Sequence, residues 1–198
     1  MNYLILTPDG VGSTILQRLL TMCLHIENNQ VVNTHELTNG LKLDKNVVKK
    51  DFSKSYNQSL SHIIELLQSS SKDFNLISRL AKYHIDTRAD KPKEQQTFYT
   101  FCNKYFDKKI MCVRENIFEY AMSWSIRKKS GVLNVYKKED REKVTNVKEV
   151  DEKYFIQKCK EYVDYHGWIE KNFTNIQIIS YESVLMNSDK VLEQLTGY

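Results

Sequence analysis

The sequence predicts an α/β fold, a single domain over residues 1–198 with a mainly parallel sheet flanked by helices. Short apolar runs typical of buried strands alternate with stretches that repeat apolar residues at helical spacing. The length, 198 residues, suits one domain with a sizeable core. Two prolines and six glycines leave no stretch with the composition of a linker. The alternation favours helices on both faces of the sheet, so ligands are expected beyond the carboxyl ends of its strands.

The first half of the chain begins with a strand, a glycine turn and a helix. An apolar run at residues 3–7 is stopped by Pro8-Asp9-Gly10, and apolar residues then recur at helical spacing over residues 11–26. The same spacing predicts a helix at 57–74, and the apolar stretch at 75–84 predicts a strand.

The second half continues the alternation. The segments expected are a helix at 97–106, a strand at 109–114, a helix at 117–129, a long helix from Asp151, a strand at 175–181 and a helix at 188–195 capped by Ser188 or Asn187. The basic stretch after Gly131 has weak periodicity, which indicates a loop with a helical turn.

Charge is concentrated in one segment. The formal net charge of the whole chain is only +4, whereas residues 127–148 hold eight basic and three acidic side chains. A charge run of this kind forms a solvated face or a polyanion-binding surface. Tyr136 is its one aromatic residue, which supports base stacking poorly, so nucleic acid is not the expected partner.

The chain is expected to be cytoplasmic, with no membrane partner. No apolar run approaches the roughly 18 residues of a membrane span, and the amino terminus lacks the basic segment and cleavage site of a signal peptide. The four cysteines are far apart and form no CxxC pair, which is typical of free thiols in a reducing compartment. No clustered ligand set predicts a metal.

The loop between the first strand and the first helix is a candidate anion site. Gly10 and Gly12 allow the backbone to turn so that the amides of Gly12, Ser13 and Thr14 point, with the helix dipole, at an anion. The segment resembles a P-loop, but Ser13 stands where a Walker loop has its lysine. The alternative is a tight turn with Ser13 or Thr14 as an ordinary helix cap.

Other candidates lie near the ends of later strands. Lys82 and His84 alternate on the expected strand at 75–84 and would face the same side, a cation beside a base. Arg114 ends the strand at 109–114, and Ser123 follows nine residues later, a combination that can grip a phosphate. Taken singly, each could be an ordinary structural residue.

Four segments in order resemble the sulfotransferase family over most of the chain. They are the loop at 8–14 with its helix, Lys82-Tyr83-His84, the stretch from Arg114 to Ser123, and Ile179-Ser180-Tyr181-Glu182. The third is most similar to the bacterial branch related to the trehalose sulfotransferase. The resemblance implies a P-loop-like architecture and transfer of a sulfuryl group from 3′-phosphoadenosine 5′-phosphosulfate (PAPS), without a metal, to a hydroxyl or amine. The acceptor, a saccharide or another hydroxyl compound, is not identified by the sequence.

The resemblance also implies a role for each matching residue. The donor-binding set comprises Gly10, Gly12, Ser13 and Thr14 at the 5′-phosphosulfate, Arg114 and Ser123 at the 3′-phosphate, and Tyr181 near the adenine. His84 would be the general base, and Lys82 would neutralise charge on the bridging oxygen and the sulfonate. Asp9 stands where many members have a basic residue, so either Lys82 would have to cover both roles or Asp9 would have to point away from the donor.

Two other functions remain open. A P-loop nucleotide kinase would need a lysine at Ser13 and an acid where Arg114 stands. A protein that binds polyanions or nucleic acid, or a nucleotide binder without catalysis, would use the basic segment at 127–148. Acceptor specificity is expected in the loops at 36–56 and 85–96 and in the basic loop, with His35 or Glu36 as a second candidate base.

Overall fold

The computed structural model describes residues 1–8, 10–26, 31–37, 43–44, 47–48, 60–69, 75–86, 92–132, 135 and 137–197. These residues form two compact units. The first contains residues 1–113 and 169–198, and the second contains residues 114–168. The expectation of a single domain stays a prediction.

The first unit is built on a five-stranded, all-parallel sheet, which confirms the predicted α/β class. The strand order is β2-β5-β1-β6-β7. Its strands are β1 (Tyr3–Leu6), β2 (Val31–Glu36), β5 (Asn75–Leu80), β6 (Lys108–Val113) and β7 (Ile176–Ser180). Two short strands, β3 (Leu43–Asp44) and β4 (Val47–Val48), pair separately in an antiparallel sense.

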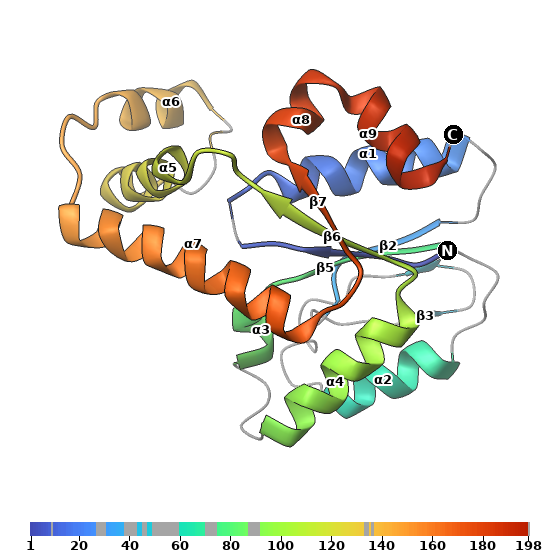
Figure 1. Cartoon of the computed structure of the whole chain (residues 1–198). Helices are drawn as coiled ribbons and strands as arrows, with labels where there is room; N and C mark the ends of the chain where they lie inside the picture. Colours follow the sequence, from blue (N-terminus) through green and yellow to red (C-terminus); the bar gives the residue numbers. More distant parts are fainter. Residues whose placement is uncertain are drawn as a thin grey trace. The chain divides into compact units, whose positions relative to one another are not determined.

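Helices cover both faces of this sheet. The helices of the first unit are α1 (Ser13–Ile26), α2 (Leu60–Ser69), α3 (Lys82–Asp86), α4 (Pro92–Tyr105), α8 (Tyr181–Met186) and α9 (Ser188–Thr196). In Figure 1, α1, α8 and α9 lie over one face of the sheet, and α2 and α4 lie over the other. Among the described residues, no helix has both the length and the apolar character required to cross a bilayer.

The central strand sets the level of the carboxyl edge. All four residues of β1 are buried, which explains their apolar run. Asn2 fixes the amino-terminal edge, because its backbone N–H donates to Asp107 (2.7 Å) and its side chain accepts from the N–H of Leu76 (3.2 Å). Leu6 pairs in register with Leu80 of β5 and with Met111 of β6, so the three strands end close to the same level.

The second unit is helical. It contains α5 (Ile117–Ser130), α6 (Lys138–Thr145) and the greater part of α7 (Glu152–Asn172), which reaches the first unit at Ile169. Cations on aromatic faces join α5 to α7: the Lys128 Nζ lies 3.9 Å from the ring centroid of Tyr154, and the Lys158 Nζ lies 5.0 Å from that of Trp124.

Several element boundaries differ from the predictions. The strand expected at 75–84 ends at Leu80, and α3 follows it. An ion pair between Lys82 and Asp86, one helical turn apart at 3.2 Å, suits a helix in place of a strand. The segment after Gly131 was expected to be a loop with a helical turn, but it contains the eight-residue helix α6. Neither β2 nor α8 was expected.

Candidate functional site

The loop after β1 makes the glycine turn that the sequence predicts before α1, and its binding of an anion stays a prediction. Gly10 and Gly12 have φ values of 83° and 79°, which favour glycine, and α1 starts at Ser13. The Thr7 N–H donates to the Leu80 carbonyl (3.3 Å), and Val11 is completely buried. The first amides of α1 have no acceptor within their own helix and carry the positive end of its dipole. Asp9 lies outside the described residues.

Arg79 supplies a cation at this loop, a feature that the sequence analysis missed. Its Nη1 donates to the Ser13 Oγ (3.0 Å) and to the Thr14 Oγ1 (2.9 Å). Arg79 belongs to β5 and pairs in register with Ile5 of the adjacent β1. The sequence held one signal for it, a single arginine within the apolar strand predicted at 75–84. The strand that carries this arginine, β5, pairs with β1, which leads into the loop.

Tyr181 packs directly on the loop. It is the first residue of α8 and not, as predicted, the end of a strand, because the Ser180 Oγ accepts from the Ser183 N–H (3.0 Å) and caps the helix. A Cβ built on Gly12 would collide with the Tyr181 ring. The structure therefore brings Tyr181 together with Gly12, as expected for residues around one ligand, while its contact with adenine stays a prediction.

The expectation that Lys82 and His84 share one face of a strand is wrong. Both belong to α3, where residues two apart point about 200° apart around the axis. The Lys82 Nζ lies 3.2 Å from the Asp86 carboxylate, and both side chains are about half exposed. The side chains of His84, His35 and Glu36 lie outside the described part of the chain.

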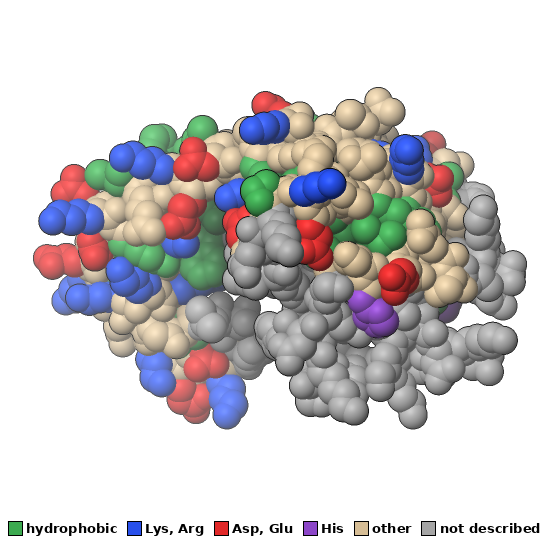
Figure 2. Space-filling view, turned by 90° about the horizontal axis from the view of Figure 1, so that it is seen from below, with side chains coloured by type: hydrophobic (Ala, Val, Ile, Leu, Met, Phe, Trp, Pro, Cys, Tyr) green, Lys and Arg blue, Asp and Glu red, His purple; other side chains and the backbone are tan. Residues whose placement is uncertain are grey.

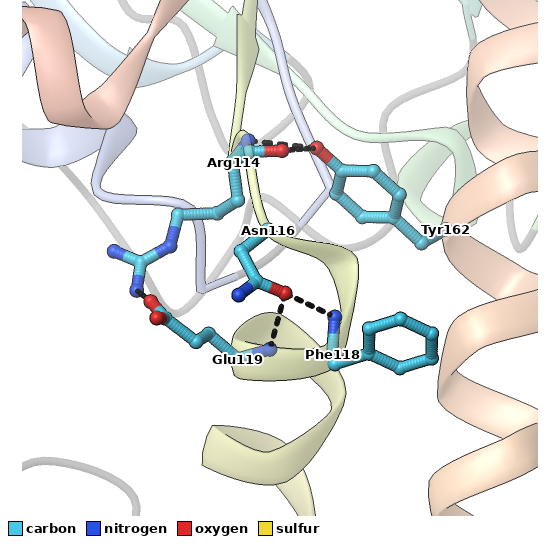
Figure 3. A network of polar contacts seen from close by, with 5 residues as sticks. All are labelled: Arg114, Asn116, Phe118, Glu119 and Tyr162. Carbon is cyan, nitrogen blue, oxygen red and sulfur yellow. Dashed lines mark hydrogen bonds and ion pairs between the residues drawn. The ribbon is translucent and has the colours of Figure 1, made fainter.

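Arg114, the first residue of the second unit, has a fixed backbone. The Tyr162 hydroxyl accepts from its N–H (2.7 Å) and donates to its carbonyl (2.9 Å), as Figure 3 shows. The Arg114 Nη2 lies 3.8 Å from the Glu119 carboxylate. The arginine side chain is 19% exposed and that of Glu119 is 64% exposed, so an anion could replace the carboxylate from the solvent side.

Ser123 belongs to α5, the helix that also carries Glu119, the partner of Arg114. Asn116 caps this helix by accepting from the N–H groups of Phe118 and Glu119 (3.0 and 3.3 Å). Ser123 follows Glu119 by one helical turn and is half-buried on the same face. The second unit therefore holds an arginine, a carboxylate and a hydroxyl in succession, which suits a phosphate grip if the carboxylate gives way.

The basic segment does not form a uniform cationic surface. An open hollow is lined by Val135, Lys137, Lys138 and Arg141. However, the Asp140 carboxylate accepts from the Lys137 N–H (3.2 Å), and Glu142 lies 4.0 Å from the Lys138 Nζ. On the face that Figure 2 shows, blue and red side chains are interspersed.

Thiols and metal ligands add no further site to the described residues. None of the four cysteines forms a disulfide, and Cys102 and Cys112 are buried. Within the described ranges, no group of three or more His, Cys, Asp or Glu side chains is arranged to hold a metal ion.

Comparisons with known proteins assign no family to the chain. No protein-family model matches it, and a search of the curated proteins finds no match. The sulfotransferase resemblance therefore rests on the order of its motifs in the sequence and stays a prediction.

Proposed function

We propose that this protein transfers a sulfuryl group from PAPS to a hydroxyl or amine of an acceptor. The observation that carries the proposal is the glycine loop at the start of α1, where helix amides, two hydroxyls and the Arg79 guanidinium gather at the carboxyl edge of a parallel sheet. This is where α/β proteins bind anionic ligands. The ring of Tyr181 beside Gly12 adds an aromatic surface next to that anion position.

The resemblance assigns the two ends of the donor to two sets of residues. Gly10, Gly12, Ser13 and Thr14 would bind the 5′-phosphosulfate, with Tyr181 near the adenine. Arg114 and Ser123 would bind the 3′-phosphate through a charge-assisted fork and a hydroxyl, after the Glu119 carboxylate is displaced from Arg114.

In the reaction, the acceptor oxygen or nitrogen attacks sulfur in line with the bridging oxygen. The new bond to sulfur forms as the sulfur–oxygen bond of the donor breaks, and 3′-phosphoadenosine 5′-phosphate (PAP) leaves. His84 would accept the proton of the acceptor. Lys82 is paired with Asp86 and lies about 200° from His84 around α3, so charge on the departing group would be neutralised by the first amides of α1. As in phosphoryl transfer, positioning and electrostatic stabilisation would supply most of the rate.

Thermal unfolding with three ligands tests this function against its alternatives. PAP should raise the melting temperature more than ATP or a nucleic-acid oligomer, because only a ligand that binds the native state stabilises it. Preferential stabilisation by ATP would support a nucleotide kinase. Preferential stabilisation by the oligomer would support polyanion binding through the segment at 127–148.

A further inference from the structure

Arg79 uses one nitrogen to bind two hydroxyls at the start of α1. Its Nη1 donates to the Ser13 Oγ at 3.0 Å and to the Thr14 Oγ1 at 2.9 Å. This nitrogen carries two hydrogens, so each hydrogen has its own hydroxyl oxygen. The two hydroxyls come from consecutive residues at the anion loop, where α1 begins.

These hydrogen bonds determine what the hydroxyls can do next. A hydroxyl has one hydrogen to donate and two lone pairs to accept with, whereas a guanidinium has donors only. Ser13 and Thr14 therefore accept from Arg79 and keep their own hydrogens for another acceptor. Each hydroxyl could in principle donate or accept. Because Arg79 already donates to both, the Ser13 and Thr14 hydroxyls are biased toward donating to a further partner.

The arginine is well placed to do this with little loss of entropy. β5 lies inside the sheet between β2 and β1, and the Arg79 backbone pairs with Glu36 on one side and Ile5 on the other. The Arg79 carbonyl also accepts from the Leu37 N–H (2.7 Å). Ser13 is only 3% exposed. Its burial makes the charge-assisted hydrogen bond from Arg79 stronger than the same bond would be in water.

We propose that Arg79 is a positioning residue that orients the Ser13 and Thr14 hydroxyls as paired donors to the anionic 5′ end of the ligand. The inference rests on the proposed function and deepens it, because it assigns the role of the missing loop lysine to a residue that acts through hydroxyls. The ligand group it selects is a phosphoryl or sulfuryl ester, which offers several acceptor oxygens and no donor.

Calorimetric binding to three probes tests the role: inorganic pyrophosphate, PAP and adenosine 3′-phosphate. Arg79→Gln should weaken pyrophosphate and PAP about 10- to 100-fold, the worth of charge-assisted hydrogen bonds. Adenosine 3′-phosphate, which has no 5′ anion, should change less than about 2-fold. Arg18→Gln, on an exposed face of α1, is the matched control and should leave all three unchanged. Equal binding of pyrophosphate and PAP by wild type and Arg79→Gln would overturn the role of Arg79.

Coupling shows whether Arg79 acts through the hydroxyls. In a Ser13→Ala/Thr14→Val background, adding Arg79→Gln should weaken pyrophosphate less than about 3-fold further, because the groups that it orients are gone. A full additional loss would mean that Arg79 contacts the anion directly, and the positioning role would be wrong. If Arg79→Gln does not fold, Arg79→Lys tests whether Arg79 matters for the 5′ anion. This variant should bind pyrophosphate about 3- to 10-fold more weakly and adenosine 3′-phosphate with unchanged affinity.

The probes also separate this inference from the proposed function. A wild type that binds pyrophosphate but not PAP would overturn the sulfotransferase proposal, and the Arg79 variants would still decide the positioning role. Equal PAP binding by the wild type and by Arg79→Gln would overturn the inference alone. A wild type that binds neither probe would overturn both.

Discussion

The ring of Tyr181 occupies the space that a Cβ on Gly12 would need, so no side chain fits there. Gly12 also has a φ of 79°, a conformation that other residues adopt only with strain. Position 12 therefore requires glycine for two separate reasons, the backbone turn that exposes the amides of α1 and the close packing of α8 on the loop.

Gly12→Ala should lower the free energy of unfolding by about 3 kcal/mol, combining the strain of a positive φ with overpacking against the ring. Gly131→Ala is the matched control, because Gly131 has a φ of 71° but nothing within 4 Å of its would-be Cβ. That control should cost about 1 kcal/mol. Urea unfolding measures both, and equal losses would show that Tyr181 moves aside without cost.

Arg114→Ala should weaken binding of PAP by about 2 to 4 kcal/mol, because it removes the charge-assisted grip on the 3′-phosphate. Adenosine 5′-phosphate lacks this group, so its affinity should barely change. The fold should stay intact, since Tyr162 holds the backbone of Arg114 and not its side chain. Equal losses for both ligands in calorimetry would reduce Arg114 to a structural residue.

Glu119→Gln should raise the affinity for PAP about 2- to 5-fold, because the 3′-phosphate no longer competes with a carboxylate for Arg114. The gain should shrink in high salt, which screens the exposed pair. Glu139→Gln, on the exposed surface of α6, should have no effect. A lower affinity in Glu119→Gln would indicate that the carboxylate orients Arg114 for the phosphate and does not compete with it.

The fold class was predictable because its signals are local. The buried strand β1 and the helix α5, with its Asn116 cap and Gly131 end, follow from runs of apolar and capping residues. The strand β2 was missed because Val31-Val32-Asn33 is short, and its pairing with β5, including an irregularity between Asn33 and His35, depends on residues distant in the sequence.

The site was predictable only where a turn defined it. The glycine spacing indicated the loop, but Arg79 joins it through strand register, which periodicity cannot reveal. The error at Lys82 and His84 has a related cause. An apolar stretch of ten residues was taken as one strand, although its second part could form a helix closed by the Lys82–Asp86 pair.

His84→Ala should reduce turnover about 10²- to 10⁴-fold once an acceptor is identified, with little effect on PAP affinity, because a positioned base acts only on the chemical step. Wild-type activity should fall on acidification, since a protonated imidazole cannot accept the acceptor's proton. If His84 is structural, the substitution should instead lower stability by about 1 to 3 kcal/mol and activity only in proportion to unfolding. Near-normal turnover per folded molecule would move the base to Glu36 or His35.

Stability at alkaline pH should reflect two buried neighbours, Cys102 and Lys109. Burial raises the pKa of the Cys102 thiol far above its ordinary value. It also lowers the pKa of the Lys109 ammonium, which the nearby Asp107 partly offsets. The Lys109 Nζ donates to the carbonyls of Asn103 and Phe106 (3.3 and 3.2 Å), close to the end of α4.

The two shifts act in opposite directions as pH rises. Above about pH 8.5 the unfolded thiol loses its proton while Cys102 in the native state keeps it, so stability falls by up to about 1.4 kcal/mol per pH unit. Between its lowered pKa and about pH 10.4, Lys109 is deprotonated in the native state while the unfolded amine stays charged, so stability rises.

Urea unfolding at pH 8, 9 and 10 should therefore give a more positive pH slope for Cys102→Ala than for wild type, and a more negative slope for Lys109→Met. The slope, unlike the absolute stability, is insensitive to the small cavity that Cys102→Ala creates. Identical slopes in all three proteins would mean that neither group titrates differently in the folded and unfolded chains.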